Sequence, residues 1–265
     1  MRRGVLVATA SLVAVIAVVR LVAQDLPPLP VAAAFEVTSV KRVTDPSVPI
    51  SARSSSNGRL SAVFNVKTLV QLAYGYPDTL RDAQVVGGPS WIDTDRFEIN
   101  ATFDGPIGLA TGGPPVRLLA MERALLADRF KLKVHGERRP LPVFDLVRSR
   151  ADGRLGPRLV RSDGSCAPNC GVKRSVPGSM SAKGIAISRF ALLISFLPDV
   201  QRVVRDRTGL TEAFDIDLEF ARTPADQDLA PLMTALKEQL GLELRAATGP
   251  VDVIVIDHVE MPTPD

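Results

Sequence analysis

The order of helices and strands expected in the front half of the chain recurs in the back half. In the front half, a helix precedes a glycine-rich turn, an alternating strand, a second helix and two short strands, at residues 66–73, 87–91, 97–103, 118–129, 130–134 and 143–148. In the back half, the same order is expected at residues 187–197, 206–210, 214–220, 229–240, 242–245 and 251–258. A period of about 115 residues is too long for a solenoid repeat and matches one small domain. The repetition therefore predicts two related copies within one chain.

Hydrophobic periodicity predicts that helices cover one face of a sheet in each copy. Apolar residues form one helical stripe at Leu229, Leu232, Met233, Leu236 and Leu240, and a similar spacing relates Leu118, Met121, Leu125 and Arg129. Gly241 follows the later helix, where a helix end favours a left-handed residue. Apolar and acidic residues alternate over 214–220, which is typical of a strand with one buried face. The predicted fold class is therefore α+β, with two internally duplicated subdomains, each with about two helices packed on a mainly antiparallel or mixed sheet.

The chain begins with a segment that is typical of a secretory signal peptide. Arg2 and Arg3 precede an apolar or small-residue run, and Ala23 is the expected last residue to be removed. The alternative is an uncleaved anchor, because a helix over residues 4–23 is long enough to span a membrane if Arg20 reaches the interface. The expected organisation is a signal peptide, a proline-rich linker, a first α+β copy, a Gly/Pro-rich connection and a second α+β copy, at residues 1–23, 24–34, 35–150, 151–178 and 179–265.

The basic balance of the whole chain comes from the signal segment. Residues 1–24 contain three arginines and no acidic residue, so the mature chain has 29 basic and 29 acidic residues. A formal charge of zero gives no argument for nucleic-acid binding. Residues 129–174 nevertheless contain twelve Lys/Arg and four Asp/Glu, whereas residues 206–265 contain four and thirteen. Two interpretations are open: solvated faces that attract each other across the interface between the two copies, or a basic strip that docks on an anionic envelope polymer or lipid surface.

The two cysteines, Cys166 and Cys170, predict a local disulfide in an exported chain. They lie in the Gly/Pro-rich connection. Redox motifs of the thioredoxin type have two residues between the cysteines, and this motif has three. A zinc site needs four ligands, and no histidine or further cysteine lies nearby in the sequence.

Histidine chemistry has little support in the sequence. His135 is expected at the end of a strand over 130–134, and His258 near the end of a strand over 251–258. Neither lies at helix or hairpin spacing from a set of metal ligands, and Asp257 should point away from the face of its neighbour His258. We therefore expect no catalytic residue, no metal site and no cofactor, and we expect the histidines to hold strand ends by hydrogen bonds.

Acidic side chains offer a second possible chemistry, in which paired carboxylates serve glycoside hydrolysis or bind calcium. The candidates are Asp93, Asp95, Asp215, Asp217 and Glu219. The last three alternate along one expected strand, which is more typical of a solvated face. Serine chemistry has no motif here, because the chain contains neither Gly-x-Ser-x-Gly nor Ser-x-x-Lys.

The motif Asp206-Arg207-Thr208-Gly209-Leu210 predicts a structural turn with a positive φ at Gly209. Asp206 or Thr208 would cap it, and a ligand contact is the alternative. Gly87-Gly88-Pro89-Ser90-Trp91 occupies a similar place in the first copy, and it lacks the Lys-Ser/Thr of a phosphate-binding loop. Its tryptophan is expected to pack in the core or a turn, or to offer a stacking platform. The candidate ligand-binding residues are therefore Trp91, Arg138, Arg139, Asp206 and Thr208.

Several short motifs resemble, in order, those of an expanded family of exported proteins from soil bacteria that is described only as a domain of unknown function. The matching stretches are Phe35–Lys41, Leu69–Tyr74, Gly87–Trp91, Leu125–Leu132, Asp206–Leu210 and Val255–His258. The resemblance covers nearly the whole mature chain and implies no activity. In some relatives a similar domain is attached to a membrane metallopeptidase of the β-lactam-sensor type, which implies extracytoplasmic sensing. This chain has no His-Glu-x-x-His motif.

Together these observations predict a periplasmic or extracellular protein, with membrane anchorage through residues 4–23 if the signal is retained. Its expected function is non-catalytic ligand binding or sensing in the cell envelope. The expected partner is a small molecule, a peptide or an envelope polymer, with no nucleic acid. The alternatives are a carboxylate-dependent hydrolase or lyase and an envelope scaffold. A binding protein should have a lined cleft, an enzyme a pocket with polar residues of perturbed pKa, and a scaffold a flat apolar patch.

Overall fold

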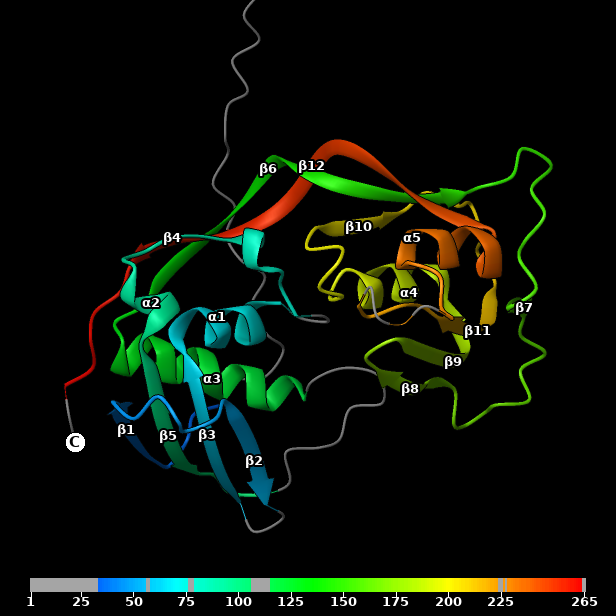
Figure 1. The fold of residues 1–265 in the computed structure, drawn as a ribbon. Helices are drawn as coiled ribbons and strands as arrows, with labels where there is room; N and C mark the ends of the chain where they lie inside the picture. The colour runs from blue at the N-terminus through cyan, green and yellow to red at the C-terminus, as the bar shows by residue number, and fades with distance from the viewer. Residues whose placement is uncertain are drawn as a thin grey trace, which may run out of the picture.

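The structure is a computed structural model that describes residues 33–55, 58–75, 79–105, 115–223, 226 and 228–263. The expected signal peptide and most of the expected linker lie outside the described residues. The described chain has an α+β fold with three four-stranded sheets (Figure 1). Two end sheets lie at opposite ends of the molecule. A central sheet extends over both halves, and helices lie between it and each end sheet (Figure 1).

The first end sheet is antiparallel and has the order β1-β5-β3-β2, with bounds Val37–Val43, Arg96–Thr102, Arg59–Asn65 and Ser51–Ser55. Helices α1 (Val66–Tyr74), α2 (Trp91–Thr94) and α3 (Val116–Arg129) lie between this sheet and the central sheet (Figure 1). We call this sheet and its three helices the first lobe. The side chain of Asn65 accepts a hydrogen bond of 2.8 Å from the Thr68 backbone, which caps α1.

The second end sheet is also antiparallel and has the order β7-β11-β9-β8, with bounds Leu159–Arg161, Ala213–Glu219, Ser179–Ala186 and Gly171–Val176. Its helices are α4 (Ile187–Ile194) and α5 (Leu232–Ala235), and α5 continues into a π-helical turn, Leu236–Leu240. We call this sheet and these helices the second lobe. Strands β7 and β8 lie within residues 151–178, which were expected to be a connection.

The central sheet is built around one long antiparallel pair, β6 (Lys133–Arg148) and β12 (Leu242–His258), which we call the central ribbon. Two short strands join its edges in parallel: β4 (Val85–Gly87), which follows a short 3₁₀ turn at Asp82–Gln84, pairs with β12, and β10 (Val203–Asp206) pairs with β6. The prediction of two short strands at the end of each copy was wrong, because each copy ends in one continuous strand.

Prolines explain why the sequence suggested interrupted strands. Pro140 and Pro142 lie inside β6 and pair with Pro250 and Thr248 of β12. Strand β10 pairs with β6 only from Val143 onward, so near the prolines β6 has a neighbour on one side only. A proline is tolerated where its missing N–H would face an open edge.

Each long strand contributes to both hydrophobic cores. Ile254 and Ile256, near the end of β12, pack in the core of the first lobe, whereas Leu242, at its start, packs in the core of the second lobe. Leu146, near the end of β6, also packs in the second core. The sequence boundaries 35–150 and 179–265 therefore do not separate the two cores in space.

The two lobes correspond residue by residue in their most buried positions. Helix α1 buries Val66, Leu69, Val70 and Ala73, and α4 buries Ile187, Phe190, Ala191 and Ile194 at the same spacing. Strand β5 and the residue after it bury Phe97, Ile99, Ala101 and Phe103, and β11 and its successor bury Phe214, Ile216, Leu218 and Phe220. The pairs Phe64–Phe97 and Ala62–Ile99 match the pairs Ile185–Phe214 and Ala182–Ile216. That the lobes superimpose as duplicated copies stays a prediction, and the order and register of their strands favour it.

The helix expected over 229–240 is shorter than its apolar pattern indicated. Leu232, Leu236 and Leu240 are buried, but Leu229 and Met233 are among the exposed large hydrophobic residues. The helix starts only after Pro231, because a proline is favoured at a helix start and is not tolerated inside one. Gly241 adopts the expected left-handed conformation, with φ of 70°.

Candidate functional site

The first lobe contains a cavity of about 250 Å³ between helices α1 and α3 and the inner face of the first end sheet. Twelve of the thirteen side chains that line it are apolar: Phe35, Ala52, Leu60, Ala62, Phe64, Leu69, Leu72, Ile99, Leu118, Leu119, Leu125 and Leu126. An apolar cavity of 150 Å³ in another protein stays dry and binds benzene. The cavity here therefore has room for a small organic molecule.

Residue sizes explain why the space is open in this lobe. Leu69 on α1 lines the cavity, and its counterpart in α4 is Phe190, which is fully buried in the core of the second lobe. The larger ring fills volume that a leucine leaves empty. The smaller side chain of Leu69 contributes to this space, and the two helices also differ at their other three buried positions.

The thirteenth lining residue is Glu122, on α3. Its Oε2 atom is buried and has no hydrogen-bond partner among the described residues. Burial raises the pKa of Glu122 to about 7. The matching position in the second lobe is the buried Leu232. A residue with positive φ follows each of the two helices, Lys131 in the first lobe and Gly241 in the second. Glu122 lies as many positions before Lys131 as Leu232 lies before Gly241.

The sequence prediction missed Glu122, although its signal is present. Residues Leu118, Leu119, Leu125 and Leu126 surround Glu122 at spacings of three and four, so a charged residue interrupts the apolar stripe of the helix. Glutamate is almost never fully buried unless it is paired. A glutamate inside such a stripe therefore indicates either an ion pair or a site.

Trp91, a predicted ligand-binding residue, begins α2 and packs in the first lobe. Its ring meets that of Phe97 edge to face, with centroids 6.1 Å apart, and Phe97 meets Phe130 in the same way at 5.1 Å. Trp91 does not line the cavity. Packing in the core, the first interpretation of this residue, is confirmed.

Arg138 and Arg139 lie on β6, and the structure gives each an acidic partner. The Nε atom of Arg138 donates to Asp252 on β12 at 2.7 Å, and that of Arg139 donates to Glu137 at 2.6 Å. Both are remote from the cavity lining. Other cations of the basic stretch also pair with acids of the C-terminal stretch, as Arg158 does with Glu219 and Arg161 with Glu212, both at 2.8 Å. Oppositely charged residues of the two stretches therefore attract each other within the central ribbon and within the second lobe, and attraction across an interface between the lobes stays a prediction.

His135 lies inside β6 rather than at a strand end, and the cross-strand register gives it partners that sequence spacing could not show. Its Nδ1 is 2.8 Å from Asp257 of β12, and its Nε2 is 3.0 Å from Glu137. Hydrogen bonds to Asp257 and then to Glu137 raise the pKa of His135. An imidazolium that donates both N–H groups to carboxylates has no lone pair with which to accept a proton, so this arrangement fits charge pairing between the two strands. His258, at the end of β12, lies 2.8 Å from Glu260.

Asp206 and Thr208 build the turn after β10. Asp206 accepts hydrogen bonds from the Thr208 backbone at 2.9 Å and from its hydroxyl at 2.7 Å, and the same hydroxyl accepts one from the Leu210 backbone at 3.1 Å. Thr208 is buried, and Gly209 has a φ of 71°. The predicted structural turn is confirmed, and the polar groups of both side chains are engaged in it.

The carboxylates considered for catalysis form ion pairs. Asp93 lies 2.9 Å from Lys67, Asp95 lies 2.7 Å from Arg42, and Glu219 lies 2.8 Å from Arg158. Asp215 and Asp217 belong to the outer face of the second end sheet, where Asp215 pairs with Lys183 at 2.8 Å. The described residues contain no group of three or more His, Cys, Asp or Glu that could hold a metal ion.

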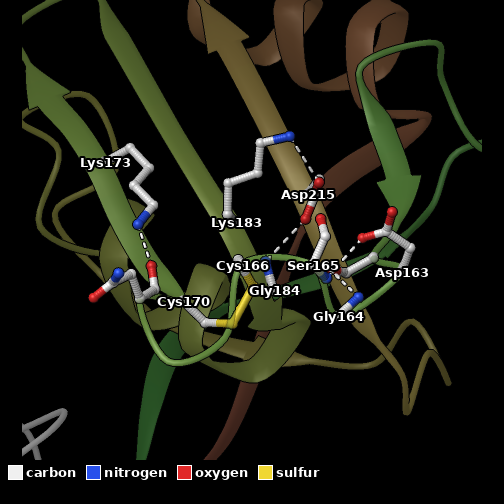
Figure 2. Close-up of a disulfide and its surroundings, with 11 residues drawn as sticks. Asp163, Gly164, Ser165, Cys166, Cys170, Lys173, Lys183, Gly184 and Asp215 are labelled. Carbon is white, nitrogen blue, oxygen red and sulfur yellow. Dashed lines mark hydrogen bonds and ion pairs between the residues drawn. A yellow bond between two sulfur atoms is a disulfide. The ribbon is translucent and has the colours of Figure 1, made fainter.

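Cys166 and Cys170 form the predicted disulfide, with Sγ atoms 2.08 Å apart. Figure 2 shows that it lies against Gly184 of β9, whose backbone N–H donates to Asp215 at 2.9 Å. A Cβ atom at Gly184 would lie 2.5 Å from Cys166 Sγ, so only glycine fits beneath the disulfide. Hydrogen bonds from Ser165 to Asp163 and from Lys173 to the Asn169 carbonyl hold the loop around it. The cross-link therefore fixes the surface loop between β7 and β8.

Within the described part of the chain, no helix is long and apolar enough to cross a membrane. Comparison with known families finds one match: residues 67–259 match a family model described as "Protein of unknown function (DUF3738)". The matched range includes α3 with Glu122, the central ribbon and the second lobe, whereas β1, β2 and β3 of the first lobe precede it. The search of curated proteins and the search of solved structures found no match.

Proposed function

The chain belongs to the DUF3738 family of unknown function, and we propose that it is a non-catalytic binding module of the cell envelope that holds a small, mainly apolar ligand in the cavity of its first lobe. The observation that carries the proposal is the cavity itself, lined by apolar side chains between two helices and a sheet. Ligand sites are typically concave and apolar, with few polar groups that orient the ligand. Soil origin and association with a metallopeptidase stay predictions.

The lining favours binding over catalysis. Glu122 is the one titratable side chain among the residues that line the cavity. Glycoside hydrolysis uses two carboxylates, and acyl transfer uses a nucleophile, a base and donors for an oxyanion. A single carboxyl group among leucines can orient a ligand and supplies none of these sets.

Location in the envelope is the second element of the proposal. The basic start and apolar run of the N-terminal segment support export, because they are typical of a signal peptide. The bonded Cys166–Cys170 pair is compatible with an oxidising compartment, in which disulfides persist. Fractionation of cells that produce the full chain tests this element, and recovery of the protein in the cytoplasm with free thiols would contradict it.

Substitution of Leu69 by phenylalanine tests the binding site, because the molecule itself has phenylalanine at the matching position. We expect phenylbutanol to shift the methyl NMR signals of the cavity leucines, such as Leu119 and Leu125, in the native protein. Leu69→Phe should abolish these shifts while the melting temperature is kept or raised, since the added ring fills existing space. If Leu69→Phe left binding intact, the ligand would bind elsewhere.

Two further variants complete this test. Leu229→Phe introduces the same change at an exposed position outside the cavity and should bind phenylbutanol like the native protein. Ala62→Leu fills the cavity from the sheet side and replaces Leu69→Phe if that variant does not fold.

A further inference from the structure

We infer that the ligand of this cavity is an apolar amine, whose protonated amino group pairs with Glu122 while its hydrocarbon body lies among the surrounding leucines. The inference rests on the proposed function and adds the chemical class of the ligand. It starts from one observation: the buried Oε2 atom of Glu122 lines an apolar cavity and has no hydrogen-bond partner among the described residues.

A buried carboxyl oxygen without a hydrogen-bond partner is unfavourable, because it has left water without gaining a hydrogen bond. The matching position in the second lobe holds Leu232, which packs there without this penalty. A glutamate at such a position is therefore explained by a partner that the described chain does not supply. An ammonium group provides both positive charge and N–H donors.

The neighbouring charged groups on the packed elements are engaged elsewhere. Arg123, next to Glu122 on α3, donates to the Ala73 carbonyl at 2.8 Å and lies over the ring of Tyr74. Lys67 on α1 lies 2.9 Å from both Asp82 and Asp93. The residues of α1 and of the sheet that line the cavity are apolar. Neither of these two cations therefore takes the place of a ligand's amino group.

Cavity size limits the hydrocarbon body of the ligand. Since a cavity of 150 Å³ holds benzene, a cavity of about 250 Å³ has room for roughly ten non-hydrogen atoms. A long fatty chain exceeds this volume, and an anionic ligand would meet the carboxylate of Glu122. A primary amine with a short aryl or alkyl body satisfies both limits.

Proton linkage distinguishes this ligand from a neutral one of the same shape. The pKa of Glu122 in the empty cavity is about 7, so the carboxylate becomes predominant as the pH rises from 6 to 8. An alkylamine stays protonated over this range, as a lysine side chain does. Its affinity should therefore increase about tenfold from pH 6 to pH 8, whereas a neutral alcohol should not gain affinity.

The experiment compares phenylbutylamine, phenylbutanol and phenylbutyrate by calorimetric titration of the folded chain at pH 6 and pH 8. At pH 8 we expect the amine to bind at least about tenfold more tightly than the alcohol, the size of one charged hydrogen bond, and the butyrate to bind most weakly. In Glu122→Gln, the amine should lose this preference and its pH dependence, while the alcohol still binds. Glu122→Leu serves if the glutamine variant does not fold.

The outcomes separate this inference from the proposed function. Equal binding of amine and alcohol to the native protein, or a preference for amine that survives in Glu122→Gln, would overturn the inference and leave the proposed function standing. Absence of binding by all three probes would overturn both.

Discussion

The first and second lobes bury side chains at matching positions between helices and an end sheet, and two of the positions at which these side chains differ concern the cavity. Where the second lobe has Phe190 and Leu232, the first lobe has Leu69 and Glu122. One difference leaves space, and the other places a carboxyl group beside that space. The order of the strands corresponds in the two end sheets, and the pairing of β9 with β11 has a register irregularity between Phe214 and Ile216 that the pairing of β3 with β5 does not have. The first lobe therefore has its candidate site where the second lobe has a larger side chain, Phe190, and an apolar one, Leu232.

The largest effects should come from the positions that the lobes share. We expect Phe97→Ala and Phe214→Ala each to lower the free energy of unfolding by about 3–5 kcal/mol, since both rings are fully buried. Because the central ribbon enters both cores, each variant should shift one common urea transition, monitored by circular dichroism. Val37→Ala, at an exposed position, should change stability by less than about 0.5 kcal/mol. Two separate transitions, with only one displaced in each variant, would show that the lobes unfold independently.

Glu122, which matches the uncharged Leu232 of the second lobe, should make the stability of the protein depend on pH. The folded-state pKa of Glu122 is raised from 4.5 to about 7, so the folded protein binds more protons than the unfolded chain between these values. The stabilisation that proton binding by Glu122 gives to the folded state is therefore complete below pH 4.5, and it is lost as the pH rises through 7. The native protein should therefore lose up to about 3 kcal/mol relative to Glu122→Gln between pH 4 and pH 8.

Urea unfolding at several pH values measures this difference. The matched control, Glu36→Gln, changes an exposed glutamate. Its free energy of unfolding should have the same pH dependence as that of the native protein. If the free energy of unfolding had the same pH dependence in the native protein and in Glu122→Gln, Glu122 would be solvated in solution.

The disulfide distinguishes the second lobe from the first in covalent structure. Joint replacement by Cys166→Ser and Cys170→Ser should lower the free energy of unfolding by at most about 2 kcal/mol, because the closed ring is only five residues long. Phenylbutanol binding in the first lobe should be unchanged in the same samples. A loss of binding together with the disulfide would connect the surface loop to the cavity and weaken the contrast between lobes.

A smaller change should make the second lobe resemble the first. Phe190→Leu should lower stability by about 1 kcal/mol, since it removes part of one buried ring. The space created should admit phenylbutanol, which would shift the methyl NMR signals of Leu193 and Leu236. Collapse of the core around the substitution, seen as absence of such shifts, would mean that the sheet and helices of the first lobe also hold its cavity open.

The sequence predicted those elements whose structure is determined by residues close together in the chain. Helix α1, strand β11, the disulfide and the turn at Gly209 all lie where periodicity, spacing or turn chemistry indicated. The continuous central ribbon could not be predicted in this way, because Pro140 and Pro250 resemble strand breakers until the positions of the edge strands β10 and β4 are known. The partner of His135 depends on the register between β6 and β12, and the cavity depends on volumes contributed by separate elements. Glu122 was visible as a charge within an apolar stripe, but its lack of a partner is a property of three dimensions.

The shared ribbon also sets the order in which the protein can fold as it is made. The core of the first lobe includes Ile254 and Ile256, which are synthesised after every strand and helix of the second lobe. A ribosome that has completed the first lobe's own helices and strands has therefore released a unit whose apolar face is still uncovered. Strand β4 likewise lacks its parallel neighbour until β12 emerges. The first lobe can therefore complete its core only after β12 has been synthesised, and until then its exposed apolar face is open to misfolding.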